Sequence, residues 1–220
     1  MSYNNLLKST KIFLLRHPHI ANEGVIPHND IPISKKGEQQ IKLWEDALSN
    51  LDIDIDVIYS SDLIRCLYFA KILSQVTDGK LLTKKELREV DQGIFCGHSF
   101  EEIQKKWPDK LEQRLKNFVD FCPPKGESIR NASIRINNFL EEIKRLPIGS
   151  RIIIITHGAI IRIIISLILK IPLSQIFSIE QDYCALNIIE LFSDDTWVIK
   201  LLNYTSQDNR CIKTTIEHFL

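Results

Sequence analysis

The stretch RIIIITHGAIIRIIISLILK, residues 151–170, joins two apolar runs through the polar residues Thr156, His157 and Gly158. Its 20 residues have the length of a membrane span, but His157 and Arg162 interrupt them near the middle. An arginine at mid-bilayer would cost about 2.5 to 3.5 kcal/mol even on the lenient insertion scale. A buried strand followed by a helix from Gly158 explains the stretch better.

The rest of the chain shows the same alternation of short apolar runs and amphipathic segments. Strands are predicted over 11–15, 55–61, 80–84, 185–192 and 197–202. Helices are predicted over 35–50, 62–76, 99–108 and 127–146, with Asp62 as the cap of the second and Pro108 as the end of the third. This order predicts an α/β fold, a three-layer sandwich whose largely parallel central sheet is flanked by helices.

Length and charge limit the class of protein. With 220 residues, of which 44% are hydrophobic, the chain can bury a sizeable core, and we expect a single domain over 1–220 with a small helical lid around 98–126. Lys and Arg total 28, and Asp and Glu total 28. Because there is no net positive field, we expect neither nucleic acid nor a membrane as a partner. Any anion must be bound locally.

Cysteine usage and the N-terminal segment bear on the compartment. The five cysteines are odd in number and lack the short paired spacing of zinc sites. The apolar run over 12–15 is too short for the core of a signal peptide. Both features favour a cytoplasmic protein.

Three of the predicted strands end in residues suited to one anion. The first, within IFLLRHPHIANEG at 12–24, delivers Arg16 and His17, the second leads to Arg65, and the third delivers His157. Ligand sites of open α/β sheets lie at the carboxyl ends of the strands. We therefore expect these side chains to converge although the two histidines are 157 − 17 = 140 positions apart.

Two arginines and two histidines suit phosphoryl transfer. Guanidinium groups hold an oxyanion during transfer, one neutral histidine can be the nucleophile, and the second stabilises the phosphoryl oxygens. A carboxylic acid must still protonate the leaving oxygen. Glu89 is the candidate, because it follows the strand over 80–84 and precedes the turn-forming Gly93. Each residue alone has an ordinary structural explanation, but the combination at strand ends favours catalysis.

Five motifs, in order, resemble the histidine phosphatase superfamily, also called the phosphoglycerate mutase-like superfamily. LLRHPHIAN is similar to its Arg-His signature, and IYSSDLIRCLYFAKIL to its Ser-Ser-x-x-x-Arg unit. LREVDQGIFCGHSFEEI is similar to the general-acid segment, PPKGES to a loop before a long helix, and IIITHGAIIRIII to the second-histidine motif. The resemblance covers nearly the whole chain and implies a phosphoglycerate mutase-like fold.

The resemblance also implies roles for the residues. His17 would be the phosphorylated nucleophile, Glu89 the proton donor, and Arg16, Arg65 and His157 the phosphate pocket. No metal or cofactor would be required.

Further residues enter through the same resemblance. Asn22 and Gly158 would contact the substrate, with Gly158 bringing a helix N-terminus close to the anion, and Glu127 and Ser128 would support the site. The remaining histidines match no invariant family position and are expected to be loop or surface residues: His19, His28, His98 and His218.

The substrate and outcome are less constrained than the chemistry. Pro18 replaces the usual glycine after the nucleophile, and this Arg-His-Pro version is similar to one found among α-ribazole phosphatases. Only 157 − 89 = 68 positions separate Glu89 from His157, which leaves room for a modest lid and favours hydrolysis over a mutase reaction. The expected function is hydrolysis of a small-molecule phosphate ester through a phosphohistidine.

Several alternatives stay open. A phosphoserine phosphatase or a phosphoglycerate mutase would use the same residues, and a non-catalytic family member would bind without turnover. A nucleotide-binding module is disfavoured, because the turn after the first strand lacks a glycine-rich fingerprint. The strands over 185–202 are expected to be core strands, with a sheet edge that forms a homodimer as the alternative.

Overall fold

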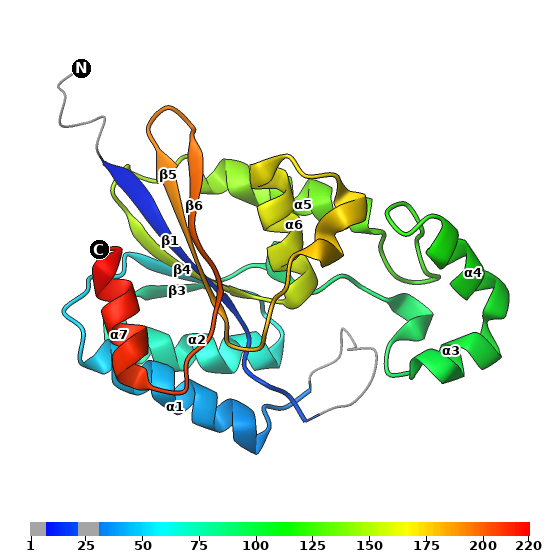
Figure 1. Ribbon diagram of the computed structural model, residues 1–220, viewed down its shortest axis with the longest axis horizontal. Coiled ribbons are helices and arrows are strands. Elements are labelled where there is room, and N and C mark those ends of the chain that lie inside the picture. Colours follow the sequence, from blue (N-terminus) through cyan, green and yellow to red (C-terminus); the bar gives the residue numbers. More distant parts are fainter. Residues whose placement is uncertain (1–7, 22–30) are drawn as a thin grey trace.

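The sheet carries the architecture. The computed structural model describes residues 8–21 and 31–220, and these form a six-stranded mixed sheet with helices on both faces (Figure 1). The strands are β1 (Ser9–Arg16), β2 (Val57–Ser60), β3 (Lys80–Thr83), β4 (Arg151–Thr156), β5 (Leu186–Phe192) and β6 (Trp197–Tyr204). Their order is β3-β2-β4-β1-β5-β6, with the first four strands parallel, β5 antiparallel to β1, and β6 antiparallel to β5. The predicted α/β class with a largely parallel sheet is confirmed.

Seven α-helices are described along these residues. They are α1 (Lys35–Ser49), α2 (Ile64–Thr77), α3 (Phe100–Lys106), α4 (Pro108–Lys116), α5 (Ile129–Ile143), α6 (Gly158–Leu169) and α7 (Asn209–His218). Three 3-10 segments connect them: η2 (Lys85–Leu87), η3 (Gly93–Phe95) and η4 (Leu173–Ser178).

Alternation along the strands builds two cores. In β1, Phe13 and Leu15 pack on the side of α1, α2 and α7, whereas Ile12 and Leu14 pack on the side of α5 and α6. Successive side chains of a strand point to opposite faces, so a strand buried on both faces reads as a continuous apolar run. The sheet is thus the middle layer of the predicted three-layer sandwich.

The predicted cap of α2 is wrong. The helix begins at Ile64, and the backbone of Leu63, without a side-chain hydrogen bond, occupies the cap position. The Asp62 carboxylate instead accepts hydrogen bonds from Arg88 Nε at 2.6 Å and Nη2 at 2.7 Å. A bidentate guanidinium is a stronger partner than a backbone N–H, and this pairing ties the start of α2 to the segment that carries Glu89.

Pro108 ends one helix and begins another. α3 stops at Lys106, as predicted, but Pro108 is the first residue of α4, which the sequence reasoning missed. Proline is favoured at the first helical position because its missing N–H has no helical acceptor there. α7 was also missed, although its signal was present: Asp208 caps it, and Ile212 and Ile216 bury one face.

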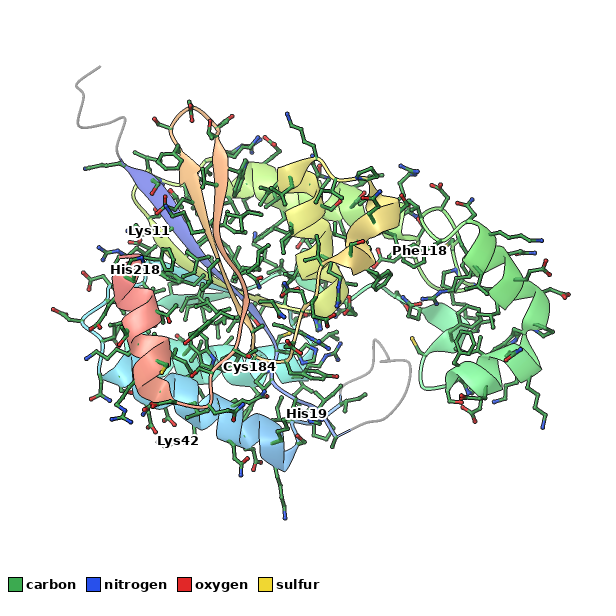
Figure 2. All side chains as sticks on the ribbon, in the orientation of Figure 1. Lys11, His19, Lys42, Phe118, Cys184 and His218 are labelled. Atoms are coloured by element: carbon green, nitrogen blue, oxygen red, sulfur yellow. The ribbon has the colours of Figure 1, made fainter. Side chains whose placement is uncertain are left out.

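The region around α3 and α4 has its own small apolar cluster. Phe95, Ile103 and Leu111 form it, and α3 and α4 project beyond the sheet (Figure 1). Phe118 lies at the junction with the body, where its ring centroid is 5.1 Å from that of Phe177 (Figure 2). That 98–126 acts as a lid stays a prediction.

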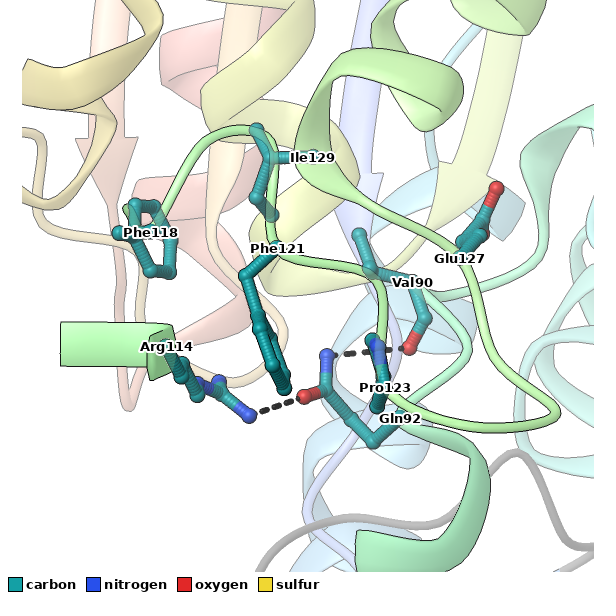
Figure 3. Close-up of a pocket in the computed structure, with 8 residues that line it drawn as sticks. All are labelled: Val90, Gln92, Arg114, Phe118, Phe121, Pro123, Glu127 and Ile129. Carbon is teal, nitrogen blue, oxygen red and sulfur yellow. Dashed lines mark hydrogen bonds between the residues drawn. The ribbon is translucent and has the colours of Figure 1, made fainter. Parts of the chain in front are cut away.

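A polar link crosses the same junction. Arg114 Nη1 donates to Gln92 Oε1 at 2.5 Å, and Gln92 Nε2 donates to the Val90 carbonyl at 3.4 Å (Figure 3). Val90 directly follows Glu89, so the position of α4 is coupled to the segment that carries the predicted acid.

The apolar stretch over 151–170 is divided between β4 and α6. Within residues 8–21 and 31–220, no helix has the length and apolar character needed to cross a membrane.

Candidate active site

Strand register brings the two histidines together. In the parallel pairing of β1 with β4, Arg16 lies opposite Thr156, so His17 and His157 follow at adjacent strand ends. The His17 backbone N–H donates to the Thr156 carbonyl at 2.9 Å. The two imidazole centroids are 5.1 Å apart. The carboxyl edge of the sheet therefore carries both imidazoles in one crevice.

His17 has the protonation pattern of a nucleophile. Its side chain is buried, and Nδ1 lies 2.8 Å from the Pro18 carbonyl oxygen. A carbonyl only accepts, so Nδ1 carries the proton and Nε2 keeps its lone pair. Burial, and then the charges of Arg65 and Arg16, hold the pKa of His17 well below its usual value. His17 is therefore neutral near pH 7, with Nε2 available for attack on phosphorus.

Arg65 and His157 are locked to each other. Both are fully buried, and Arg65 Nε donates to His157 Nδ1 at 3.2 Å. Because Nδ1 accepts, the imidazole carries its proton on Nε2, which lies 2.9 Å from Ser61 Oγ. Ser61 was not predicted as a site residue. Its signal is its position in the Ser-Ser-x-x-x-Arg unit, which sets it beside the imidazole that orients the arginine.

The Arg16 guanidinium contacts Gln181 and Tyr183, and its Nε is available as a hydrogen-bond donor. Its Nη1 donates to the Gln181 carbonyl at 2.6 Å, and its Cζ lies 3.8 Å from the centroid of the Tyr183 ring. Its Nε is buried without a hydrogen-bond partner among the described residues. A buried guanidinium N–H with no protein acceptor is suited to an anion oxygen.

The loop that holds Arg16 is itself fixed by a buried amide pair. Gln181 and Asn187 exchange two side-chain hydrogen bonds of 2.9 Å each. Gln181, Tyr183 and Asn187 were not predicted as site residues. No sequence signal marks them, because they approach Arg16 only through the pairing of β5 with β1.

Gly158 gives the two guanidinium groups their room. It is the first residue of α6, and a β-carbon there would lie 3.0 Å from Arg162 Nη1 and 3.4 Å from Arg16 Cζ and Nε. Arg162 was not predicted either, although it interrupts an otherwise apolar helix. Its Nε donates to the Ile179 carbonyl at 2.7 Å, and burial followed by the Arg16 charge lowers its pKa. Positive charge thus collects at the start of α6, where helix N–H groups also favour an anion.

Glu89 reaches the same helix terminus. Thr156 Oγ1 donates to the Leu87 carbonyl at 2.7 Å and so holds the incoming segment against the end of β4. The Glu89 Oε2 atom accepts from the Ala159 N–H at 3.3 Å, and Oε1 accepts from the Val90 N–H at 2.9 Å. The Glu89 carboxyl group therefore lies against the first turn of α6, at Ala159, the residue after Gly158.

Glu127 and Ser128 hold segments behind the predicted phosphate pocket in place. Ser128 caps α5 through its side chain. Glu127 Oε1 accepts from Arg135 Nη2 at 2.6 Å, and the same nitrogen donates to the Arg88 carbonyl at 2.9 Å. Through Arg135, Glu127 therefore stabilises the position of the backbone next to Glu89.

Asn22, predicted to contact the substrate, lies outside the described residues, as does His28. His19 lies in the loop after β1, as expected, and is half-buried: its Nδ1 lies 2.8 Å from Ser34 Oγ, and its ring centroid is 4.9 Å from that of Tyr183. His19 packs against the ring that faces Arg16. Among the described side chains, no group of three or more His, Cys, Asp or Glu could hold a metal ion.

Comparison with known proteins agrees with this geometry. The family model described as "Histidine phosphatase superfamily (branch 1)" matches residues 12–205. The chain is 27% identical over 191 residues to the "Probable phosphoglycerate mutase GpmB" of Escherichia coli O1:K1 / APEC, covering 86% of this chain and 87% of that protein.

Solved structures share the fold. The α-ribazole phosphatase from Shigella flexneri superimposes with a TM-score of 0.78 at 17% identity, covering 90% of this chain and 98% of that one. The mycobacterial glucosyl-3-phosphoglycerate phosphatase gives a TM-score of 0.76 at 18% identity, with 90% and 100% covered.

The chain belongs to the histidine phosphatase superfamily, branch 1. It is an enzyme of that phosphatase class, with a phosphoglycerate mutase-like α/β fold.

Proposed function

We propose that the protein hydrolyses a small-molecule phosphate monoester through a phosphohistidine on Nε2 of His17. The observation that carries the proposal is the state of His17, a buried neutral imidazole with its proton fixed on Nδ1. Burial, followed by the charges of Arg65 and Arg16, depresses the pKa of His17, and an anion between the two arginines would be held in front of the nucleophile.

In the first step, Nε2 attacks the phosphorus atom and the bond to the ester oxygen breaks. The phosphoryl oxygens accept hydrogen bonds from Arg16 Nε, from the Arg65 guanidinium and from the N–H groups at the start of α6. Glu89 gives its proton to the departing oxygen, so that an alcohol leaves. The electron pair of the broken bond stays on that oxygen.

In the second step, water attacks the phosphoryl group and the N–P bond breaks. Glu89, now a carboxylate, takes a proton from the water, and its own acid form is restored. The products are inorganic phosphate and neutral His17. His157 serves both steps by orienting Arg65, and its ring centroid lies 5.1 Å from that of His17.

The first candidate for the substrate is α-ribazole phosphate, supported by the Arg-His-Pro sequence at 16–18. A phosphoglycerate mutase is the second candidate function, favoured by the name of the relatives that share 27% identity. Incubation with 3-phosphoglycerate and, separately, with α-ribazole phosphate distinguishes the two: a mutase converts the first into 2-phosphoglycerate, whereas an α-ribazole phosphatase releases inorganic phosphate from the second.

The nucleophile is tested by acid-sensitive labelling. Enzyme mixed with a ³²P-labelled substrate and quenched is expected to carry a phosphate that is labile in acid and stable in base, on a peptide containing His17. His17→Ala should lose the label and the turnover. A label on serine, or full activity in His17→Ala, contradicts the mechanism.

A further inference from the structure

A cavity of about 210 Å³ lies beside α2 and has one residue, Arg65, in common with the anion pocket. The described residues lining it are Pro32, Ile33, Glu38, Ile64, Arg65 and Tyr68. Arg65 therefore has one side on the cavity while its Nε is bonded to His157. Arg65 is itself fully buried and separates this space from the two histidines, so an ester whose phosphate contacts Arg65 would extend its alcohol part past the guanidinium into the cavity.

The cavity wall is apolar and already exposed. Ile64 is 47% exposed and Tyr68 is 48% exposed, and they stand one helical turn apart on α2, on either side of Arg65. Across from them, Pro32 and Ile33 precede α1. Covering these side chains with an apolar group removes their surface from water, which favours binding.

Its charge selects against acids. Among the described lining residues, Glu38 is the one acidic group and Arg65 the one basic group. The Glu38 carboxylate makes no hydrogen bond or ion pair with another described residue, and the Arg65 charge would be used by the phosphate. A carboxylate on the leaving group would meet a like charge at Glu38, whereas an N–H, O–H or cationic group would find an acceptor there.

We infer that this cavity is the leaving-group subsite, and that it takes phosphate monoesters whose alcohol part is apolar or aromatic, bears a hydrogen-bond donor or positive charge, and lacks a carboxylate. The inference rests on the proposed phosphatase function. A ligand cavity for a whole drug-sized molecule measures roughly 300 to 1,000 Å³. The volume here fits one ring-sized fragment beside the phosphate.

The test is a matched set of alkyl phosphates. Wild-type kcat/KM is measured with ethyl phosphate, 2-phenylethyl phosphate, and 2-phenylethyl phosphate bearing either a para-carboxylate or a para-aminomethyl group. We expect the phenyl ring to raise kcat/KM about tenfold or more over ethyl phosphate, which corresponds to about 1.4 kcal/mol. The carboxylate should cancel that gain, and the aminomethyl group should keep it.

Two variants locate the effect. Tyr68→Ala should lower the ratio of kcat/KM for phenylethyl over ethyl phosphate about fivefold or more, because part of the apolar wall is lost. Glu38→Gln should restore activity toward the carboxylate substrate without helping the aminomethyl one. Ile134→Ala, at a 57% exposed position on α5, is the matched control and should leave both ratios unchanged.

The outcomes separate the two proposals. If wild-type enzyme releases no phosphate from ethyl, phenylethyl or p-nitrophenyl phosphate, the proposed function fails. If it releases phosphate but does not distinguish phenylethyl from ethyl phosphate, or prefers the carboxylate substrate, the subsite is refuted while the phosphatase stands. Should Tyr68→Ala fold poorly, the wild-type panel and Glu38→Gln still decide.

Discussion

The Tyr183 ring is predicted to set the affinity of the site for phosphate, through Arg16. The guanidinium carbon lies 3.8 Å from the ring centroid, with the backbone of Gly158 on another side. Tyr183→Leu keeps an apolar side chain but removes the π face. A cation–π contact is worth about 1 to 2 kcal/mol when partly desolvated. Phosphate binding should therefore weaken about 5- to 30-fold.

The assay is calorimetric titration of the free enzyme with vanadate and with inorganic phosphate, at one pH and ionic strength. Tyr183→Phe is the matched control, because the ring stays, and its affinity should remain within about twofold of wild type. The loss in Tyr183→Leu should appear in Kd for both anions. Wild-type affinity in Tyr183→Leu, or equal losses in both variants, would refute the view that the ring orients Arg16.

Three further predictions concern the reacting groups. Arg65→Ala should lower kcat/KM by about 10²- to 10³-fold, the usual cost of losing one hydrogen-bond donor to the transition state. The control variant Lys71→Ala, on the exposed face of α2, should change kcat/KM little. Similar kcat/KM values for the two variants would show that Arg65 is an ordinary helix residue. Glu89→Gln should slow phosphorylation of the enzyme by an alkyl phosphate about 10²- to 10⁴-fold, and much less with p-nitrophenyl phosphate, whose leaving group needs no proton; equal losses would exclude Glu89 as the general acid. Because folding lowers the pKa of His17, the unfolded chain binds the extra proton first, so stability should fall as pH drops below about 6.5, by up to about 1.4 kcal/mol per pH unit. Urea unfolding at a series of pH values should show a shallower dependence in His17→Gln, and parallel curves would contradict the burial of a neutral His17.

The elements of the fold were largely predictable because their signals are local. The apolar runs at 11–15 and 151–156 became β1 and β4, and the amphipathic segments became α1, α2 and α5. The misses are also informative. α4 is short and buries little apolar surface, so packing rather than propensity decides it, whereas the cap and apolar face of α7 are visible in the sequence and were overlooked. Asp62 has the sequence position of a helix cap, but its carboxylate binds the Arg88 guanidinium instead.

The sequence by itself determined which residues could do chemistry here. Ordered motifs along the chain mark the five residues concerned, which lie at strand ends, near a helix start or after a short 3-10 segment: Arg16, His17, Arg65, Glu89 and His157. Parallel strands end at the same edge, so the element order predicted that both histidines lie on one edge of the sheet, and the pairing of β1 with β4 makes them neighbours there.

Only the tertiary structure decided how those residues are held. The Tyr183 ring, the Gln181 carbonyl and the Ser61 hydroxyl reach the site across strand pairs and loops, and their contacts with Arg16 and His157 leave no periodic trace in the sequence. The same applies to the cavity beside Arg65, which exists because α1 and α2 pack together on one face of the sheet. Periodicity records which side of an element is buried, but side-chain contacts between distant segments depend on packing geometry, which a linear pattern does not encode.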